Sequence, residues 1–244
     1  LLVGKAEIPT EISLNVKPQL SGARKVVISP LANEYPLIHY NWVQDNIKKV
    51  DQASNGRIGY IYIPDMGPEG LNEFARYFYP QLDKEGLIID DRANGGGNVS
   101  PMILERLSRE PYRLTMGRGT SHVGTVPDAV QVGPKVCLIN KYSASDGDLF
   151  PWGFRALGLG KLIGTRTWGG IVGISGSLPY MDGTDIRVPF FTSYDPKTGK
   201  WIIENHGVDP DILIDNDPVK EWNGEDQQLN RAIEEVMKQL KDRK

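Results

Sequence analysis

The sequence predicts an α/β fold in which a mostly parallel sheet is flanked by helices. Short apolar runs typical of buried strands occur at 58–63, 87–89, 136–139 and 161–163. Between these runs lie segments in which apolar residues recur every three or four positions, which is the spacing of a helix. Strands that alternate with helices in this way usually lie side by side in parallel, with the helices covering the sheet.

The first 30 residues contain only two strand-like runs, 11–16 and 25–28. A stretch of this length cannot bury a core of its own. We therefore expect residues 1–30 to be the end of another module with its linker, and residues 31–244 to form the α/β domain. The chain begins with Leu1 and has no initiator methionine, so we expect a piece of a longer protein or a chain that has lost a signal peptide.

The helices are expected from periodicity together with residues that start or stop a helix. They are 36–50, 71–82, a segment after Ser100, 149–157 and 226–244. Ser-Asn-Gly at 54–56 is a turn that ends the first helix. Ser100 and Asp226 are the expected caps of two later helices, and Pro101 suits a first helical position.

The segment 111–134 is rich in Gly, Thr, Ser and Pro and shows weak periodicity. We expect a long irregular excursion with one short strand at 112–115, and such excursions often have a function. In the last third of the chain the expected strands are 177–181, 186–191 and 201–203, with a hairpin turn at 195–200.

Composition excludes several classes of protein. The chain is 39% hydrophobic and 24% charged, as in globular proteins. A net charge of −3 argues against a nucleic-acid partner bound by phosphate neutralisation. No apolar run approaches the roughly 20 residues that span a bilayer, so no membrane insertion is expected. The single cysteine, Cys137, is expected to be a packed thiol. The sequence does not decide whether the protein is located in the cytoplasm or in the periplasm.

The strongest chemical candidate is Ser145, in a turn of small residues that follows the strand at 136–139. If a helix begins directly after it, the N–H of Asp146 would point toward an oxyanion formed at the serine. Pro151 suits a first helical turn, so the helix could instead begin near Asp148, itself a good cap. The plain alternative is that Ser143 and Ser145 are only turn and capping residues.

Two further segments are candidates for the same site. Gly95–Gly97 follows the strand at 87–89, and glycines let a backbone approach a ligand closely. The run lacks both the Walker pattern and the dinucleotide spacing, so no nucleotide cofactor is expected. Glu204 ends the strand-like run at 201–203 and could orient a base, or be a solvated surface acid.

Histidines are few, and none has the spacing of a metal site. His39, His122 and His206 are each possible bases. No lysine stands out by pattern as the alternative base for a serine. We expect no metal and no cofactor.

Three stretches together resemble the tail-specific (C-terminal processing) serine peptidases, and among them the tricorn branch. They are DDRANGGGN at 90–98, NKYSASDGDLFPWGFRALGLGKLIGTRTWGG at 140–170 and ENHGVDPDI at 204–212. The resemblance covers about 31–217. It implies a ClpP/crotonase-like α/β core that cleaves peptide bonds through an acyl-enzyme.

By this resemblance Ser145 matches the nucleophile. The N–H of Asp146 and that of Gly96 or Gly97 match the oxyanion hole, and Glu204 matches the acid that supports the base through an intervening serine. The implied partners are peptides or unfolded protein, and further copies of the chain in a homo-oligomer, in which a neighbouring subunit lends an acid for specificity.

The sequence departs from the family pattern in its base. Members of the Ser-Lys type carry a lysine where this chain has Gly170, which argues against that mechanism. The tricorn branch uses a histidine, preceded by a serine, from a region before its PDZ domain. Residues 1–30 resemble only the end of a PDZ-like module, and none of the three histidines matches the family position. We therefore expect the base to lie outside this chain.

Two other functions stay open from the sequence. The missing base favours a peptide-binding module that keeps the fold without hydrolysis. A crotonase-like acyl-CoA enzyme would share the core, but no stretch offers an adenine and pyrophosphate site. Apolar residues around Trp168, Ile171 and Ile174 could present a strand edge to an extended peptide, or pack in an ordinary sheet.

Overall fold

A computed structural model describes residues 7–175 and 179–243, and the chain divides into two compact units, Leu1–Asp45 and Asn46–Lys244. The N-terminal unit contains the two strands expected near 11–16 and 25–28, β1 (Thr10–Leu14) and β2 (Arg24–Ile28), which pair as an antiparallel hairpin. Most side chains of this hairpin are exposed or half-buried, in line with a segment that has no core of its own. Helix α1 (Tyr35–Ser54) begins in this unit and continues into the second.

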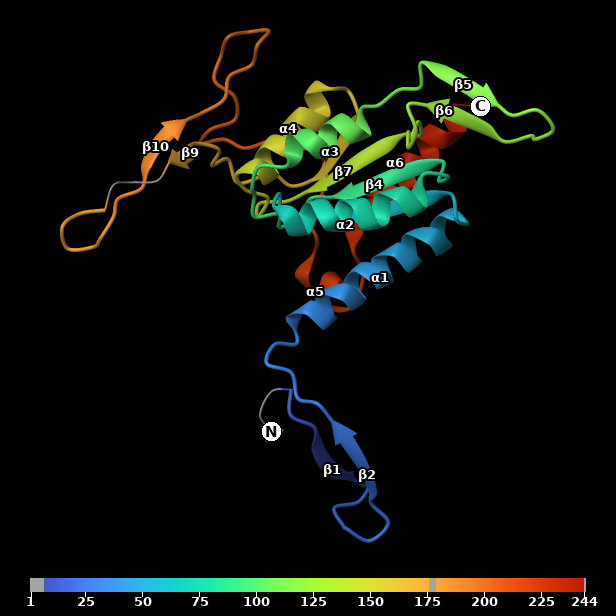
Figure 1. Cartoon of the computed structure of the whole chain (residues 1–244), viewed down its shortest axis with the longest axis vertical. Coiled ribbons are helices and arrows are strands. Elements are labelled where there is room, and N and C mark those ends of the chain that lie inside the picture. Colours follow the sequence, from blue (N-terminus) through green and yellow to red (C-terminus); the bar gives the residue numbers. More distant parts are fainter. Residues whose placement is uncertain (1–6, 176–178, 244) are drawn as a thin grey trace. The chain divides into compact units, whose positions relative to one another are not determined.

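The larger unit is built on a parallel five-stranded sheet, which confirms the predicted fold class (Figure 1). The strand order is β11-β8-β7-β4-β3. The strands are β3 (Ile58–Tyr62), β4 (Gly86–Asp90), β7 (Lys135–Ile139), β8 (Gly160–Gly164) and β11 (Ile212–Leu213). Every residue of β3, β4 and β7 is buried. Strands buried on both faces read as continuous apolar runs, which is why the sequence predicts them.

Helices cover both faces of this sheet. They are α2 (Pro68–Phe78), α3 (Ser100–Leu107), α4 (Asp146–Ala156) and α6 (Gln227–Asp242). The same unit also contains a 3₁₀ turn η1 (Tyr79–Gln81) and the short helix α5 (Pro218–Trp222). Leu87 and Ile89 of β4 belong to the core under α2, α3 and α4. A Cβ on Gly86 would instead point at Val236 of α6, so α6 packs on the opposite face. Each fully buried aliphatic or aromatic side chain stabilises this arrangement by about 1.5–3 kcal/mol.

Several expected strands differ from the observed ones. The excursion at 111–134 holds a hairpin of two strands, β5 (Arg113–Met116) and β6 (Val123–Val126), rather than one strand. A second hairpin pairs β9 (Gly173–Ser175), which was not expected, with β10 (Val188–Phe191). The strand expected at 177–181 is wrong for 179–181, and 177–178 lie outside the described residues. At 201–203 only an isolated bridge from Trp201 to Tyr194 forms.

Two helix starts also differ from expectation. Ser100 is the first residue of α3 and not its cap, because its backbone N–H and hydroxyl bond to the carboxylate of Asp146 instead. Helix α4 begins at Asp146, so Pro151 lies inside the helix and the alternative start near Asp148 is wrong. Asp226 does cap α6, since its Oδ1 accepts from the N–H of Leu229 at 3.0 Å.

Cys137 is a buried free thiol in β7, as expected. Within 7–175 and 179–243, no helix combines the length and apolar character needed to cross a bilayer.

Lys135, the first residue of β7, supplies a test of this fold. Burial, with the positive charge of Arg243, lowers the pKa of Lys135 from 10.5 to about 8. Between pH 8 and 10.5 the unfolded chain therefore binds a proton that the folded chain has released, so stability rises with pH in this window. We compare the free energy of unfolding of the wild type with that of Lys135→Met, which lacks this titration. From pH 7 to pH 10 the wild-type value should rise by ~2 kcal/mol relative to that of the variant. Urea unfolding of both chains measures this difference, and a constant difference across this range would contradict the burial of the charge.

Candidate active site

The predicted site residues lie on loops that leave the carboxyl ends of the parallel strands. The loop 91–99 follows β4, the turn 140–145 follows β7 and the loop 165–172 follows β8. In parallel α/β sheets, ligands bind outside the carboxyl ends of the strands. The sheet therefore brings these loops to one edge, where most such folds place their chemistry.

Ser145 is exposed at the start of α4 and has a left-handed backbone, with φ of 58° and ψ of −119°. It occupies the N-cap position, yet its side chain makes no capping hydrogen bond. No hydrogen bond of its hydroxyl is found within the described residues. A serine in this strained conformation is uncommon and clusters at functional sites. The reading of Ser145 as a capping residue is therefore not supported by its contacts.

Ser143 differs from Ser145 in its burial and in its hydrogen bonding. Its side chain is buried, and its hydroxyl donates to the carbonyl of Asp91 at 2.8 Å. The expected role as a turn residue fits Ser143, which fastens the serine turn to the neighbouring loop.

The glycine run lies directly against Ser145. The N–H of Ala144 donates to the carbonyl of Asn94 at 2.8 Å, and the N–H of Ala93 donates to Asn140 Oδ1 at 3.0 Å. A Cβ built on Gly96 would lie 2.6 Å from the Cβ of Ser145 and 3.0 Å from the nitrogen of Asp146. Gly96 also has φ of +94°, so both the conformation and the space favour glycine there.

The two loops that meet at Ser145 each carry a backbone N–H without a partner. In the part of the chain that the structure describes, the N–H groups of Asp146 and Gly97 make no hydrogen bond. The N–H of Gly96 is already used, since it donates to Asn94 Oδ1 at 2.9 Å. The Asp146 N–H lies in the first turn of α4, where N–H groups lack intrahelical partners and the helix dipole favours negative charge. Of the three expected donors, Asp146 and Gly97 therefore keep an unused N–H, whereas Gly96 does not.

The side chain of Asp146 fixes the backbone that carries this donor. It is buried, and it accepts from the N–H of Ser100 at 3.0 Å and from the Ser100 hydroxyl. The carboxylate thus satisfies the N-terminus of α3 while holding the first residue of α4 in place.

Buried acids lie beneath the serine turn. Burial, together with the charge of Asp90, raises the pKa of Asp91 well above its usual range. Neither carboxyl oxygen of Asp91 has a hydrogen-bond partner among the described residues. Burial also raises the pKa of Asp148, although hydrogen bonds from Thr167 and from the N–H of Gly169 oppose this shift. Burial therefore favours the neutral form of Asp91 over the charged one.

A series of backbone contacts leads from the serine turn to Glu204. The N–H of Trp168 donates to the carbonyl of Ser143 at 2.9 Å, and the N–H of Gly169 donates to Asp148 Oδ1 at 2.8 Å. The carbonyl of Gly169 in turn accepts from the N–H of Asn205 at 2.7 Å. The loop after β8 is therefore bonded on one side to the serine turn and on the other to the segment with Glu204.

Glu204 is half-buried and holds this loop. Its Oε2 accepts from the N–H of Ile171 at 2.7 Å and from the N–H of Val172 at 2.9 Å. Within the residues described, Oε1 makes no hydrogen bond and is available to another group. This carboxylate is therefore a positioned group and not a freely solvated surface acid.

Among the residues that the structure describes, no lysine or histidine is hydrogen-bonded to Ser145. A Cβ on Gly170 would lie 2.1 Å from the ring of Trp168, so a longer side chain there requires the ring to move. His206 Nε2 pairs with Asp209 Oδ2 at 2.8 Å on the surface, and His122 lies just before β6. Neither makes a hydrogen bond to Ser145, and His39 belongs to the N-terminal unit.

Sequence reasoning missed the polar residues that join these loops, namely Asn94, Asn140 and the bonded role of Asp148. Their one signal is position, because each lies within a few residues of a strand end or of the serine. Among the described residues, no group of three or more histidine, cysteine or acidic side chains is arranged to hold a metal.

Comparison with known proteins agrees with this geometry. The model of Peptidase family S41 matches residues 57–214. The tricorn protease of Thermoplasma volcanium is 41% identical over 242 residues, which are 98% of this chain and 23% of that protein. Tricorn protease homolog 1 of Streptomyces coelicolor is 39% identical over 96% of this chain and 22% of its own length. A crystal structure of the tricorn protease superposes with a TM-score of 0.87 at 39% identity, covering 97% of this chain and 23% of that one.

The chain thus spans less than a quarter of the length of these relatives. Its likeness to them extends over nearly all of its own residues, including the serine turn, the glycine run and the segment with Glu204. The chain belongs to peptidase family S41.

Proposed function

We propose that this chain is the catalytic part of a serine endopeptidase that cleaves peptides or unfolded protein through an acyl-enzyme on Ser145. The observation that carries the proposal is the exposed, left-handed Ser145 in contact with Gly96, on two loops that each keep an unbonded backbone N–H, those of Asp146 and Gly97. The hydroxyl oxygen attacks the peptide carbonyl and loses its proton to a base. The N–H groups of Asp146 and Gly97 stabilise the oxyanion. The base then protonates the leaving amine, and water hydrolyses the ester.

The base is proposed to be a histidine, preceded by a serine, outside this chain. On this proposal residues 1–30 are the end of a PDZ-like module and 31–244 the catalytic core. Glu204 supports the arrangement because its Oε2 is used by the loop 171–172, which leaves Oε1 for the intervening serine. The matched part is 23% of the tricorn protease of Thermoplasma volcanium, so that relative has ample length outside it for such a base.

The proposed partners are a peptide substrate and further copies of the chain in a homo-oligomer. The strand β9, which follows the loop held by Glu204, has an exposed Ile174 and suits an extended peptide added along its edge. The two relatives named above are proteases by name, which supports a peptide over an acyl-CoA substrate. Sedimentation of the longer protein tests for the oligomer, and a monomer at micromolar concentration would count against it.

The experiment for the activity uses the longer protein that carries this chain. It is mixed with an internally quenched peptide and with an unfolded protein, and the products are identified by mass spectrometry. Internal cleavage that a serine-directed phosphonate abolishes is the expected result. Peptide binding without cleavage favours the silent binding module, and binding of a CoA ester without cleavage favours the crotonase-like enzyme. Either outcome would overturn the proposed peptidase.

Glu204 gives a graded prediction for this function. Glu204→Ala removes the acceptor of two loop N–H groups and the support of the base, so we expect kcat/KM to fall about 100-fold. Glu204→Gln keeps one oxygen for the loop and loses only the charge, so its kcat/KM should fall about tenfold. Steady-state kinetics of both, with the exposed Glu234→Ala as the matched control, measure this order. Equal activity of all three variants would show that Glu204 is only a surface acid.

A further inference from the structure

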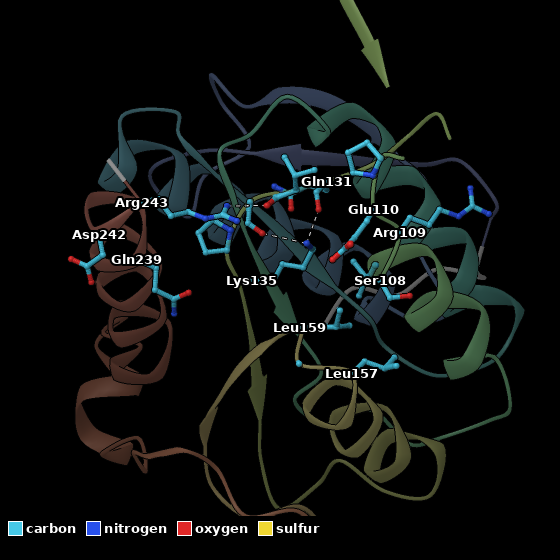
Figure 2. A pocket seen from close by; sticks show the side chains of 16 residues that line it. Ser108, Arg109, Glu110, Gln131, Lys135, Leu157, Leu159, Gln239, Asp242 and Arg243 are labelled. Carbon is cyan, nitrogen blue, oxygen red and sulfur yellow. Dashed lines mark hydrogen bonds between the residues drawn. The ribbon is translucent and has the colours of Figure 1, made fainter. Parts of the chain in front are cut away.

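A pocket lies where strand β7 begins, at the end of the sheet opposite to the serine turn. Its volume is about 620 Å³, which is within the range of sites for small molecules. It is lined by the ends of α3, α4 and α6 and by the segment 131–135 that leads into β7 (Figure 2). Because β7 begins at this pocket and ends before the serine turn, the length of a five-residue strand, about 13 Å, separates the two places.

Lys135 is the buried cation of this pocket. Its ammonium group donates to the carbonyls of Gln131 at 2.6 Å and Gly133 at 3.3 Å, which leaves one N–H without a partner. Among the residues described, no carboxylate lies within 4.0 Å of Lys135 to balance its charge. A buried ammonium bound only by neutral carbonyls is an unfavourable arrangement that an anion would relieve.

Arg243 stands beside Lys135 and is also unbalanced. Its Nη1 donates to the carbonyl of Val132 at 2.9 Å, and no ion pair of Arg243 is found in the described part of the chain. Figure 2 shows Lys135 and Arg243 bonded to the same short segment. The charge of Arg243 contributes to the lowered pKa of Lys135, which shows that the two cations act on each other. Two neighbouring cations with spare donors form a receptor for a carboxylate.

The rest of the wall selects against a highly charged anion. Glu110 and Asp242 line the same pocket, and no ion pair to either is found within the described ranges. The C-terminal ends of α3 and α4 also open here, and helix C-termini favour positive charge and N–H donors. Gln131 adds a buried Oε1 that has no partner among the described residues. The pocket therefore offers donors on one side and acceptors on the other.

We propose that this pocket binds a short peptide or a free amino acid, with its carboxylate between Lys135 Nζ and the Arg243 guanidinium and its N–H groups toward the acceptors. A phosphate would supply negative charge but nothing for the acceptors, and would face two carboxylates. The proposal stands apart from the peptidase activity, although the products of peptide hydrolysis have this chemistry.

The test is calorimetric titration of the 244-residue chain carrying Ser145→Ala, so that no hydrolysis is involved. The probes are trialanine, trialanine amide and inorganic phosphate. Trialanine should bind, and its amide, which lacks the carboxylate, should bind about tenfold more weakly, as should phosphate. Equal binding of trialanine and its amide, preference for phosphate, or no heat up to about 10 mM trialanine would each overturn the proposal.

Variants place the binding in this pocket. Arg243→Ala changes an exposed residue at the end of α6 and should weaken trialanine binding about tenfold. Arg109→Ala is the matched control, because Arg109 lines the same pocket but is already paired with Glu105 at 2.8 Å. Lys135→Met should abolish binding, with circular dichroism to show that the chain is folded. Unchanged binding by Arg243→Ala, or equal loss in Arg109→Ala, would contradict the assigned position.

Discussion

Ser145→Ala is expected to lower kcat for peptide hydrolysis by about five orders of magnitude, as removal of the nucleophile does in serine peptidases. The hydroxyl is exposed at the start of α4, and within the described residues it makes no hydrogen bond that a loss would disturb. Alanine fits the same backbone no worse than serine, so folding should change little. The effect should therefore be confined to kcat.

Steady-state kinetics of the longer protein measure this loss, with thermal unfolding to show an unchanged fold. Ser121→Ala, an exposed serine between β5 and β6, is the matched control and should keep full activity. Hydrolysis by Ser145→Ala within tenfold of the wild type would mean that another group is the nucleophile.

Gly96→Ala is expected to lower kcat/KM by about 1000-fold, comparable to the loss of an oxyanion donor. The new methyl would lie 2.6 Å from Ser145 Cβ, 2.8 Å from the carbonyl of Ala144 and 3.0 Å from the nitrogen of Asp146. It therefore fills the space where the oxyanion has to form. The left-handed φ of +94° adds a backbone strain of about 1–2 kcal/mol for a residue with a side chain.

Gly95→Ala is the matched control for this prediction. A Cβ on Gly95 meets no atom within 4 Å, and its backbone is not left-handed. The two variants differ by one position in the same run, so a general weakening of the loop would affect both. Kinetics and thermal unfolding of each separate the two causes. Equal losses of activity in Gly95→Ala and Gly96→Ala would remove the argument that Gly96 borders the oxyanion.

The sequence predicts those strands of the sheet that are buried on both of their faces. The runs that became β3, β4 and β7 are continuous apolar stretches, which no other element of that length explains as well. The two-residue β11 has no such pattern, and its pairing depends on β8 being beside it. The start of α4 was ambiguous because Pro151 usually marks a first turn, whereas here packing of the helix outweighs one lost hydrogen bond.

The sequence offers candidate residues for the site, but it does not predict the contacts between them. A serine turn after a buried strand and a glycine run after another are local patterns. The contact of Gly96 with Ser145 depends on β4 and β7 being neighbours, which only the sheet order decides. The hydrogen bonds of Glu204 to the loop 171–172 likewise join segments far apart in the sequence. The pocket at Lys135 left no sequence signal, because it is formed by the ends of three helices.

The account depends on Ser145 being the nucleophile, and covalent labelling tests this most directly. The longer protein is treated with a peptidyl phosphonate, digested and analysed by mass spectrometry to locate the adduct. We expect a single adduct on the peptide that carries Ser145, and no adduct in the Ser145→Ala variant. An adduct on a different residue, in a protein whose hydrolysis the phosphonate blocks, would contradict it.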